Sequence, residues 1–141
     1  MIVYADSSFV VSLYVTDTRS ADARSRVAQA QSLIFTPLHR AEWFHALAKQ
    51  QFRGNLSAEQ ALQIDARFAS DQTSGLWRET ELPELVFDIC SDLARRHGAK
   101  LGVRTLDSLH VACALELKAE RFWTFDDRQA KLARAEGLKT V

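Results

Sequence analysis

Several features that mark other protein classes are scarce in this chain of 141 residues. It has two prolines and five glycines, which excludes a collagen-like or linker-rich protein. No stretch approaches the roughly 20 apolar residues of a membrane-spanning helix, and the N-terminus shows no basic leader followed by a long apolar run. We therefore expect a soluble, cytoplasmic protein with no membrane partner.

Net charge is also missing. Eighteen Lys and Arg residues balance 18 Asp and Glu residues, so no overall basic field attracts nucleic acid. This balance does not exclude a nuclease, because a bound metal supplies local positive charge and a few arginines can follow a phosphate backbone. The class of partner must therefore be inferred from motifs.

Soft metal ligands are few. Cys90 and Cys113 lie in apolar helical patterns without the close spacing of a thiolate metal site. We predict two buried thiols in a reducing compartment rather than a disulfide. The histidines also lack ligand spacing, which argues against a zinc site; they are His39, His45, His97 and His110.

The composition that is present, 47% hydrophobic and 26% charged, is typical of one compact domain spanning residues 1–141. Short β-branched or aromatic runs alternate with helical patterns, which predicts an α/β fold with a mostly parallel sheet covered on both faces. Strands are expected over 2–5, 33–35, 76–80, 122–125 and 138–141. Helices are expected over 7–14, 38–53, 57–71, 84–97, 105–119 and 127–137. A further polar helix is expected to follow the break at 16–18 and to end at about residue 30.

Local signals set the predicted helix ends. Pro37 opens one helix, and Ser57 with Gln60 has the spacing of a capping box. Gly98 is expected to end a helix and Thr105 to cap the next one.

Two aspartates directly follow predicted strands, where open α/β sheets bind their ligands. These are Asp6 and Asp126. The alternative for either residue is that it only caps the following helix.

Glu42 lies at the border of a predicted apolar stripe when its helix is drawn at about 100° per residue. That stripe comprises Leu38, Ala41, His45, Ala48 and Phe52. A carboxylate at this border needs a partner or a metal. A salt bridge to an arginine such as Arg40 or Arg104 is the alternative.

Asp107 stands in the first turn of a helix that is apolar nearly all round, so its carboxylate is expected to point into a crevice. Complementing the helix dipole is the competing role. Together, Asp6, Glu42, Asp107 and Asp126 offer the hard oxygen ligands that magnesium prefers. Such an ion would relieve their mutual repulsion and activate water.

With these four acids in this order, the chain resembles a known family, the PIN-domain ribonucleases, and specifically the VapC-like toxins of bacterial type II toxin–antitoxin pairs. The resemblance spans nearly the whole chain. Its pieces are Ile-Val-Tyr-Ala-Asp6-Ser-Ser, Ala41-Glu42, Arg104-Thr-Leu-Asp107-Ser-Leu-His-Val-Ala, and Thr124-Phe-Asp126 followed by Ala130, Gly137-Leu138 and Val141.

The resemblance implies a PIN-like three-layer sandwich with four to five strands and a magnesium- or manganese-dependent endoribonuclease. Asp6 and Asp107 correspond to the principal metal ligands, and Glu42 to a residue that binds a second ion or orients water. Asp126 completes the cluster, with Ser8, Thr124 and Asp127 as helpers. Asp127 has a competing role, which we favour, as the N-cap of the last helix.

The resemblance also implies an RNA substrate, a cognate antitoxin and a homodimer. An apolar groove for a partner could be lined by Phe9, Val10, Leu13, Trp43, Phe44 and Leu47, although such stripes are more often core. A basic cluster is either a solvated helix end or a phosphate track; it comprises Arg95, Arg96, His97, Lys100 and Arg104.

Three other functions are alternatives to the nuclease. A phosphatase would need an aspartate two residues after Asp6, where Ser8 stands, and a phosphoacceptor domain would need a central aspartate after the third strand. A catalytically inactive PIN-like binding module would have little reason to retain all four acids. This inactive module is the main alternative to the nuclease.

Overall fold

The computed structural model describes residues 1–140, so Val141 lies outside the described residues. The chain divides into two compact units. The first unit joins Met1–Asp6 to Glu81–Val141, and the second unit, Ser7–Thr80, is inserted between these two segments. The first unit is therefore discontinuous in sequence.

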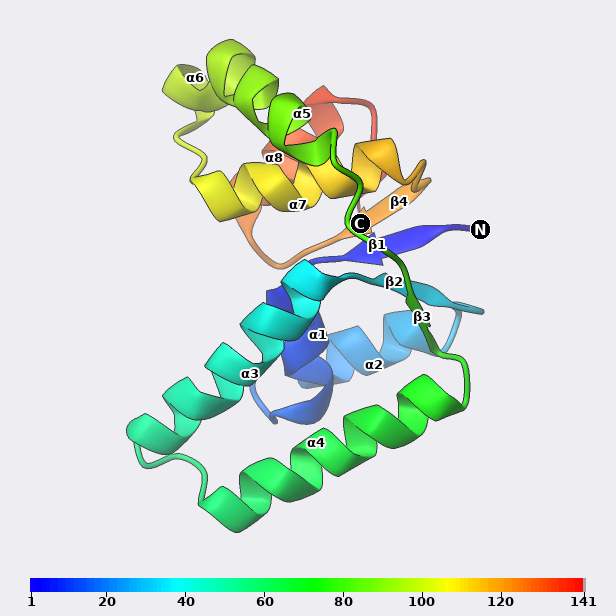
Figure 1. The fold of residues 1–141 in the computed structure, drawn as a ribbon, viewed down its shortest axis with the longest axis vertical. Helices are drawn as coiled ribbons and strands as arrows, with labels where there is room; N and C mark the ends of the chain where they lie inside the picture. The colour runs from blue at the N-terminus through cyan, green and yellow to red at the C-terminus, as the bar shows by residue number, and fades with distance from the viewer. Residues whose placement is uncertain (141) are drawn as a thin grey trace. The chain divides into compact units, whose positions relative to one another are not determined.

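The first unit pairs two strands in parallel and packs helices beside them (Figure 1). Helix α5 packs against α7, and α7 packs against α8. Its elements are β1 (Val3–Ala5), α5 (Val86–Leu93), the π-helical η1 (Ala94–Gly98), α6 (Ala99–Leu101), α7 (Thr105–Glu116), β4 (Arg121–Trp123) and α8 (Asp127–Ala135).

The buried centre of the first unit is built on β1 and α7. Tyr4 stacks on Phe122 with ring centroids 5.6 Å apart, and its hydroxyl lies 2.8 Å from His110 Nδ1. Helix α7 is buried without a break from Asp107 to Ala114, as its all-round apolar sequence predicted. A helix of this kind can present a carboxylate only to an enclosed, polar environment.

Both cysteines are free and buried, as predicted. Burial raises the pKa of the Cys113 thiol to about 11 and also raises the pKa of Cys90. Neither thiol is therefore in the thiolate form that reacts or binds metal at neutral pH.

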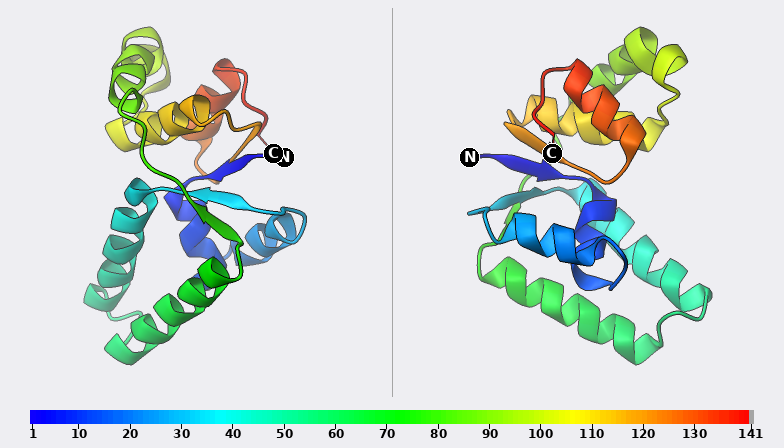
Figure 2. Two further views of the ribbon diagram at one scale, coloured as in Figure 1. Left: turned by 45° about the vertical axis from the view of Figure 1, so that its right-hand side comes forward. Right: turned by 180° about the vertical axis from the view of Figure 1, so that it is seen from behind.

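The second unit also pairs two parallel strands, and its helices α3 and α4 form a hairpin that both views of Figure 2 show. Its core is aromatic: Trp43 and Phe68 lie 4.9 Å apart, and Trp77 Nε1 donates to the hydroxyl of Tyr14 at 2.7 Å. The elements are α1 (Ser7–Tyr14), α2 (Ser20–Val27), β2 (Leu33–Phe35), α3 (Pro37–Phe52), α4 (Ala58–Thr73) and β3 (Trp77–Glu79).

The predicted apolar stripe of α3 is wrong. The buried residues are His39, Trp43 and Leu47, whereas Phe52 is 93% exposed. The large indole of Trp43 determines which side of the helix is buried, because an alanine contributes little apolar area. The predicted groove is mostly core: Phe9, Val10, Leu13, Trp43 and Leu47 are buried, and only Phe44 of that set is exposed.

Several predicted helix ends are confirmed and two are wrong. Ser57 and Gln60 form the predicted capping box. Gly98 does not end a helix, because the π-helical turn carries the chain on to Gly102, whose φ of 65° ends it. Thr105 is the first residue of α7 rather than its cap, since Arg104 holds the extended N-cap conformation.

The first three strands lie within their predicted ranges, but β4 ends at Trp123 rather than at Phe125, so Asp126 follows the strand by three positions instead of directly. The closing strand predicted over 138–141 is present as an isolated parallel bridge between Lys139 and Arg121, and its last residue falls outside the described part of the chain. No helix among residues 1–140 is both long and apolar enough to span a bilayer.

Candidate metal centre and its hydrogen-bond network

A buried chain of hydrogen bonds in the first unit starts at Asp6. Because β1 aligns Ala5 with Trp123 of β4, the residues that follow these strands lie at the same sheet edge. The Thr124 hydroxyl donates to Asp6 Oδ2 at 2.7 Å, and Asp6 is only 1% exposed. Thr124, predicted as a helper, thus contacts a predicted metal ligand directly.

Asp126 extends this chain to helix α8. Its backbone N–H donates to Thr124 Oγ1 at 2.9 Å, and its Oδ1 accepts from the backbone N–H of Gln129 at 2.9 Å. Asp126 is therefore the N-cap of α8, so the preference for Asp127 in that role is wrong. Asp127 is the first helical residue, and its exposed carboxylate pairs with Lys131.

Gln129 connects these hydrogen bonds to Asp107. Its Nε2 donates to Asp107 Oδ1 at 3.0 Å, while the backbone N–H and Nε of Arg104 donate to Asp107 Oδ2 at 3.2 and 3.1 Å. Three of the four predicted acids therefore belong to one hydrogen-bonded group. We call this group the acidic network; it consists of Asp6, Thr124, Asp126, Gln129 and Asp107.

Asp107 is ionised at neutral pH. Burial alone would raise its pKa, but the hydrogen bonds from Gln129 and Arg104 stabilise the charged form and hold the pKa below its usual value. The group is 4% exposed. It is thus a buried carboxylate that keeps its negative charge, as a ligand for a cation must.

Glu42 lies in the second unit, where the hydroxyl of Ser7 donates to its Oε1 at 2.8 Å. The two arginines offered as salt-bridge partners bind other carboxylates: Arg40 pairs with Glu79 and Arg104 with Asp107. Ser7 follows Asp6 directly in the sequence, so a residue adjacent to one predicted ligand holds another.

The donor set of the acidic network fits a hard divalent cation. Asp6, Asp107 and Asp126 supply carboxylate oxygens, and the side-chain oxygen of Gln129 is buried with no hydrogen-bond partner among residues 1–140. No group of three His, Cys, Asp or Glu side chains within that range is arranged to hold an ion by itself. Magnesium does not require such a group, because it keeps several waters and binds through one or two carboxylates.

Sequence reasoning missed Gln129, which belongs to the acidic network, and Ser7, which donates to Glu42 in the second unit. Gln129 is the third residue of α8, so its contact with Asp126 could be found only once the helix start was known. Ser8, which was expected to help, is exposed, and its carbonyl accepts a bond from Ser12.

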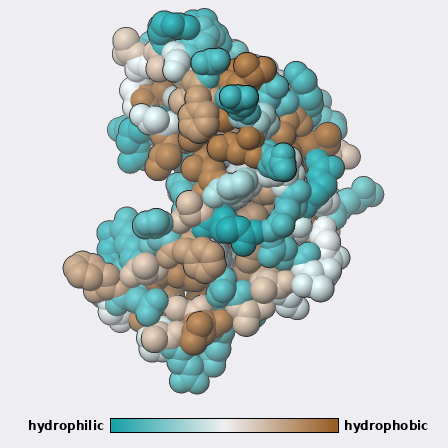
Figure 3. All heavy atoms as spheres, viewed as in Figure 1, coloured by the Kyte–Doolittle hydropathy of each residue, from teal (hydrophilic) through white to brown (hydrophobic). Residues whose placement is uncertain are grey.

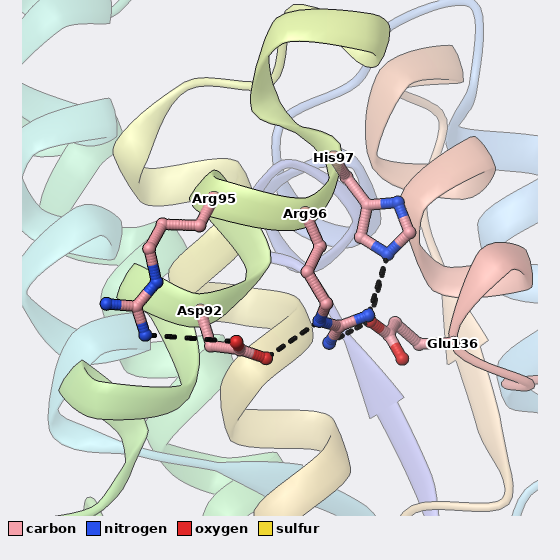
Figure 4. A network of polar contacts seen from close by, with 5 residues as sticks. All are labelled: Asp92, Arg95, Arg96, His97 and Glu136. Atoms are coloured by element: carbon pink, nitrogen blue, oxygen red, sulfur yellow. Dashed lines mark hydrogen bonds and ion pairs between the residues drawn. The ribbon is translucent and has the colours of Figure 1, made fainter.

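The predicted basic cluster is not one surface in the structure. Figure 4 shows that Arg95 and Arg96 pair with Asp92, while Arg96 and His97 also bind Glu136. We call these five residues the paired-charge cluster. Arg104 instead binds Asp107 of the acidic network. This pairing favours the alternative of a solvated helix end, and contact with RNA stays a prediction.

Comparison with known proteins gives the family. The model of the PIN domain matches residues 3–135, so the chain belongs to the PIN-domain family. No curated protein sequence matches the chain.

Three solved structures resemble the chain over nearly its full length. VapC20 of Mycobacterium tuberculosis, a toxin that cleaves the sarcin-ricin loop, is 16% identical with a TM-score of 0.69, covering 99% of this chain and 98% of that one. VapBC2 of Rickettsia felis, bound to a promoter DNA fragment, is 15% identical with a TM-score of 0.70, covering 100% and 98%.

The third structure, FitAcB of Neisseria gonorrhoeae, is 14% identical with a TM-score of 0.72, covering 99% of this chain and 96% of that one. At these identities the likeness shows the fold. The predicted class, an α/β PIN-like fold with a parallel sheet, is confirmed.

Proposed function

We propose that this protein is a magnesium- or manganese-dependent endoribonuclease that acts as the toxin of a toxin–antitoxin pair. The observation that carries the proposal is the acidic network. Its three carboxylates are linked through the uncharged groups of Thr124 and Gln129, and two of them, Asp6 and Asp107, are at least 96% buried. Concentrated buried negative charge of this kind favours a divalent cation.

Each acid has a proposed role. Asp6 and Asp107 are the principal metal ligands, and Asp126 completes the set from the N-cap of α8. Glu42, held by Ser7, binds a second ion or orients the attacking water. The bound ion would supply Lewis-acid polarisation of the phosphodiester and lower the pKa of a water molecule.

The residues then have to place a water oxygen in line with a phosphorus–oxygen bond of RNA. Thr124 fixes Asp6 through a 2.7 Å bond, and Gln129 and Arg104 fix both oxygens of Asp107. Hydrolysis joins the water oxygen to phosphorus and breaks the bond to the leaving oxygen, which takes up a proton. Ligands that are already oriented avoid reorganisation during this step.

The test uses purified, antitoxin-free protein with total cellular RNA in magnesium, manganese or chelator. Asp6→Asn is the test variant, and Asp92→Asn, which removes a carboxylate from the paired-charge cluster, is the matched control. Metal-dependent cleavage by the wild type and the control, but not by Asp6→Asn, supports the nuclease. If the wild type and both variants are folded and none of them cleaves RNA, the result would instead favour the inactive binding module.

We further propose a cytoplasmic homodimer that is neutralised by a cognate antitoxin. Exposed large apolar side chains support a protein partner: apolar surface lies over α5 and α7 in Figure 3, where Leu85, Phe87 and Leu106 are exposed. Light scattering should give twice the chain mass of 15.9 kDa for the dimer. A monomer at all concentrations would contradict it.

We also propose that the two units form a single domain, since one family match spans residues 3–135 and therefore both units. The expected result is one cooperative thermal unfolding transition by calorimetry, whereas two separate transitions would contradict it.

A further inference from the structure

One polar atom of the acidic network has no partner among residues 1–140. Gln129 is 5% exposed, and its Nε2 donates to Asp107, yet its Oε1 is buried without a hydrogen bond. An unpaired buried polar atom costs free energy, and in native proteins it usually marks a bound water, an ion or a functional role. The surroundings of the Gln129 oxygen indicate which of these applies.

The orientation of the amide is fixed by its surroundings. Turning it over would place Oε1 against Asp107 Oδ1, so that two acceptors would meet at the present 3.0 Å contact. The ionised carboxylate would lose a donor at the same time. The free atom is therefore the oxygen, not the nitrogen.

The position of Gln129 connects this oxygen to the predicted ligands. Its backbone N–H binds Asp126, its side-chain N–H binds Asp107, and the free oxygen belongs to the same carboxamide. A hydrated divalent ion held by neighbouring carboxylates carries waters whose hydrogens need acceptors.

We infer that Gln129 belongs to the metal centre, where its Oε1 accepts a hydrogen bond from a water of the hydrated ion while its Nε2 donates to Asp107. This inference rests on the proposed function, because it requires the acidic network to bind a metal. It gives a neutral residue of the network two tasks at the metal centre.

The direct test measures manganese binding by titration calorimetry, without RNA. Gln129→Met keeps the length of the side chain but cannot donate or accept, and the exposed Gln63→Met in the second unit is the matched control. Gln129→Met should weaken manganese binding by about 10- to 100-fold, and Gln63→Met should leave it unchanged. Equal manganese affinity in Gln129→Met and the wild type would overturn the inference and leave an ordinary buried water as the partner.

A second variant separates the oxygen from the nitrogen. Gln129→Glu keeps an acceptor but cannot donate to Asp107, and its added charge should lower the melting temperature of the metal-free protein by like-charge repulsion. If the oxygen faces the ion, Gln129→Glu should bind manganese at least as tightly as the wild type, and Gln63→Glu controls for added charge. Binding as weak as in Gln129→Met would show that only the bond to Asp107 matters, which also overturns the inference.

These outcomes are distinct from failure of the proposed function. If the folded wild type binds no manganese, the metal centre itself is wrong, and the role of Gln129 falls with it. If the wild type binds and Asp6→Asn does not, the metal centre stands, and the Gln129 variants alone decide the inference.

Discussion

The first unit contains two polar networks of similar size and opposite design. The paired-charge cluster of Figure 4 sets each carboxylate against an arginine, and its Arg95 and Arg96 are 77% and 47% exposed. The acidic network joins its carboxylates through a hydroxyl and an amide, with Asp6 and Asp107 almost fully buried. One network pairs each carboxylate with a cation near the surface, whereas the other brings three carboxylates together in a largely buried group, with Arg104 as a charged donor to Asp107.

This difference separates stability from function. Exposed ion pairs contribute little and are screened by salt. Buried carboxylates are costly even when a charged donor such as Arg104 contacts one of them, and buried ion pairs are weak evidence for stability, so stability alone is a poor explanation for this network. The contrast therefore points to the acidic network as the working site.

The largest expected effect is on catalysis. Asp107→Asn removes a buried negative charge, and metal-dependent RNA cleavage should fall by about 100-fold or more. Glu136→Gln removes a carboxylate from the paired-charge cluster and should leave the rate unchanged. Initial rates on a fluorescent RNA compare the two variants, and a similar loss in both would remove the distinction between the networks.

The second effect is on stability with metal. Manganese at about 100 times its dissociation constant should stabilise the wild type by about 2.7 kcal/mol. Asp92→Asn should gain the same amount, whereas Asp6→Asn should gain little. Thermal unfolding with and without manganese measures this, and stabilisation of Asp6→Asn equal to that of the wild type would place the ion elsewhere.

The third effect concerns the hydroxyl that links Asp6 to Asp126. Thr124→Val keeps the shape of the side chain but removes the hydrogen bonds that Asp6 Oδ2 and the backbone N–H of Asp126 make with the hydroxyl, and should destabilise the protein by about 1–3 kcal/mol. Urea denaturation measures the change. Thr73→Val provides the matched control, because that exposed hydroxyl binds only the backbone of its own helix.

The smallest effect belongs to the paired-charge cluster. Arg96→Gln breaks one exposed ion pair, with Asp92, and one half-buried pair, with Glu136. It should lower the melting temperature only slightly, with the difference shrinking further in 0.5 M salt, roughly three times the physiological ionic strength. RNA cleavage should be unchanged. A large loss of cleavage would show that this helix end contacts RNA after all.

The sequence predicted the acids that follow strands better than the residues that hold them. Asp6 and Asp126 could be found because β-branched runs end just before or close to them, and parallel strands place their ends at one edge. Gln129 could not be found, since its role depends on where α8 begins, and an error of one residue there assigned the cap to Asp127. Local capping signals alone did not separate two adjacent aspartates.

The predictions of one helix face and one helix end were wrong because of how these helices pack and wind. The predicted stripe of α3 gave small and large apolar residues equal weight. In the structure the indole of Trp43 is buried, and it determines which side of the helix faces the core. At η1 the π-helical turn inserts a residue into the helical repeat, which no pattern of period 3.6 can anticipate.

The discontinuity of the first unit has a consequence for synthesis on the ribosome. Asp6 is synthesised before the whole second unit, and Thr124, which binds it, is 118 residues later in the chain. Strand β1 likewise has to wait for β4 before it can pair. Long-range closure of this kind is slow relative to local folding, and the acidic network can assemble only after residues up to Gln129 have been made. A nascent chain that has not reached Gln129 therefore lacks the network, and the proposed activity would arise only once both segments of the first unit have been synthesised.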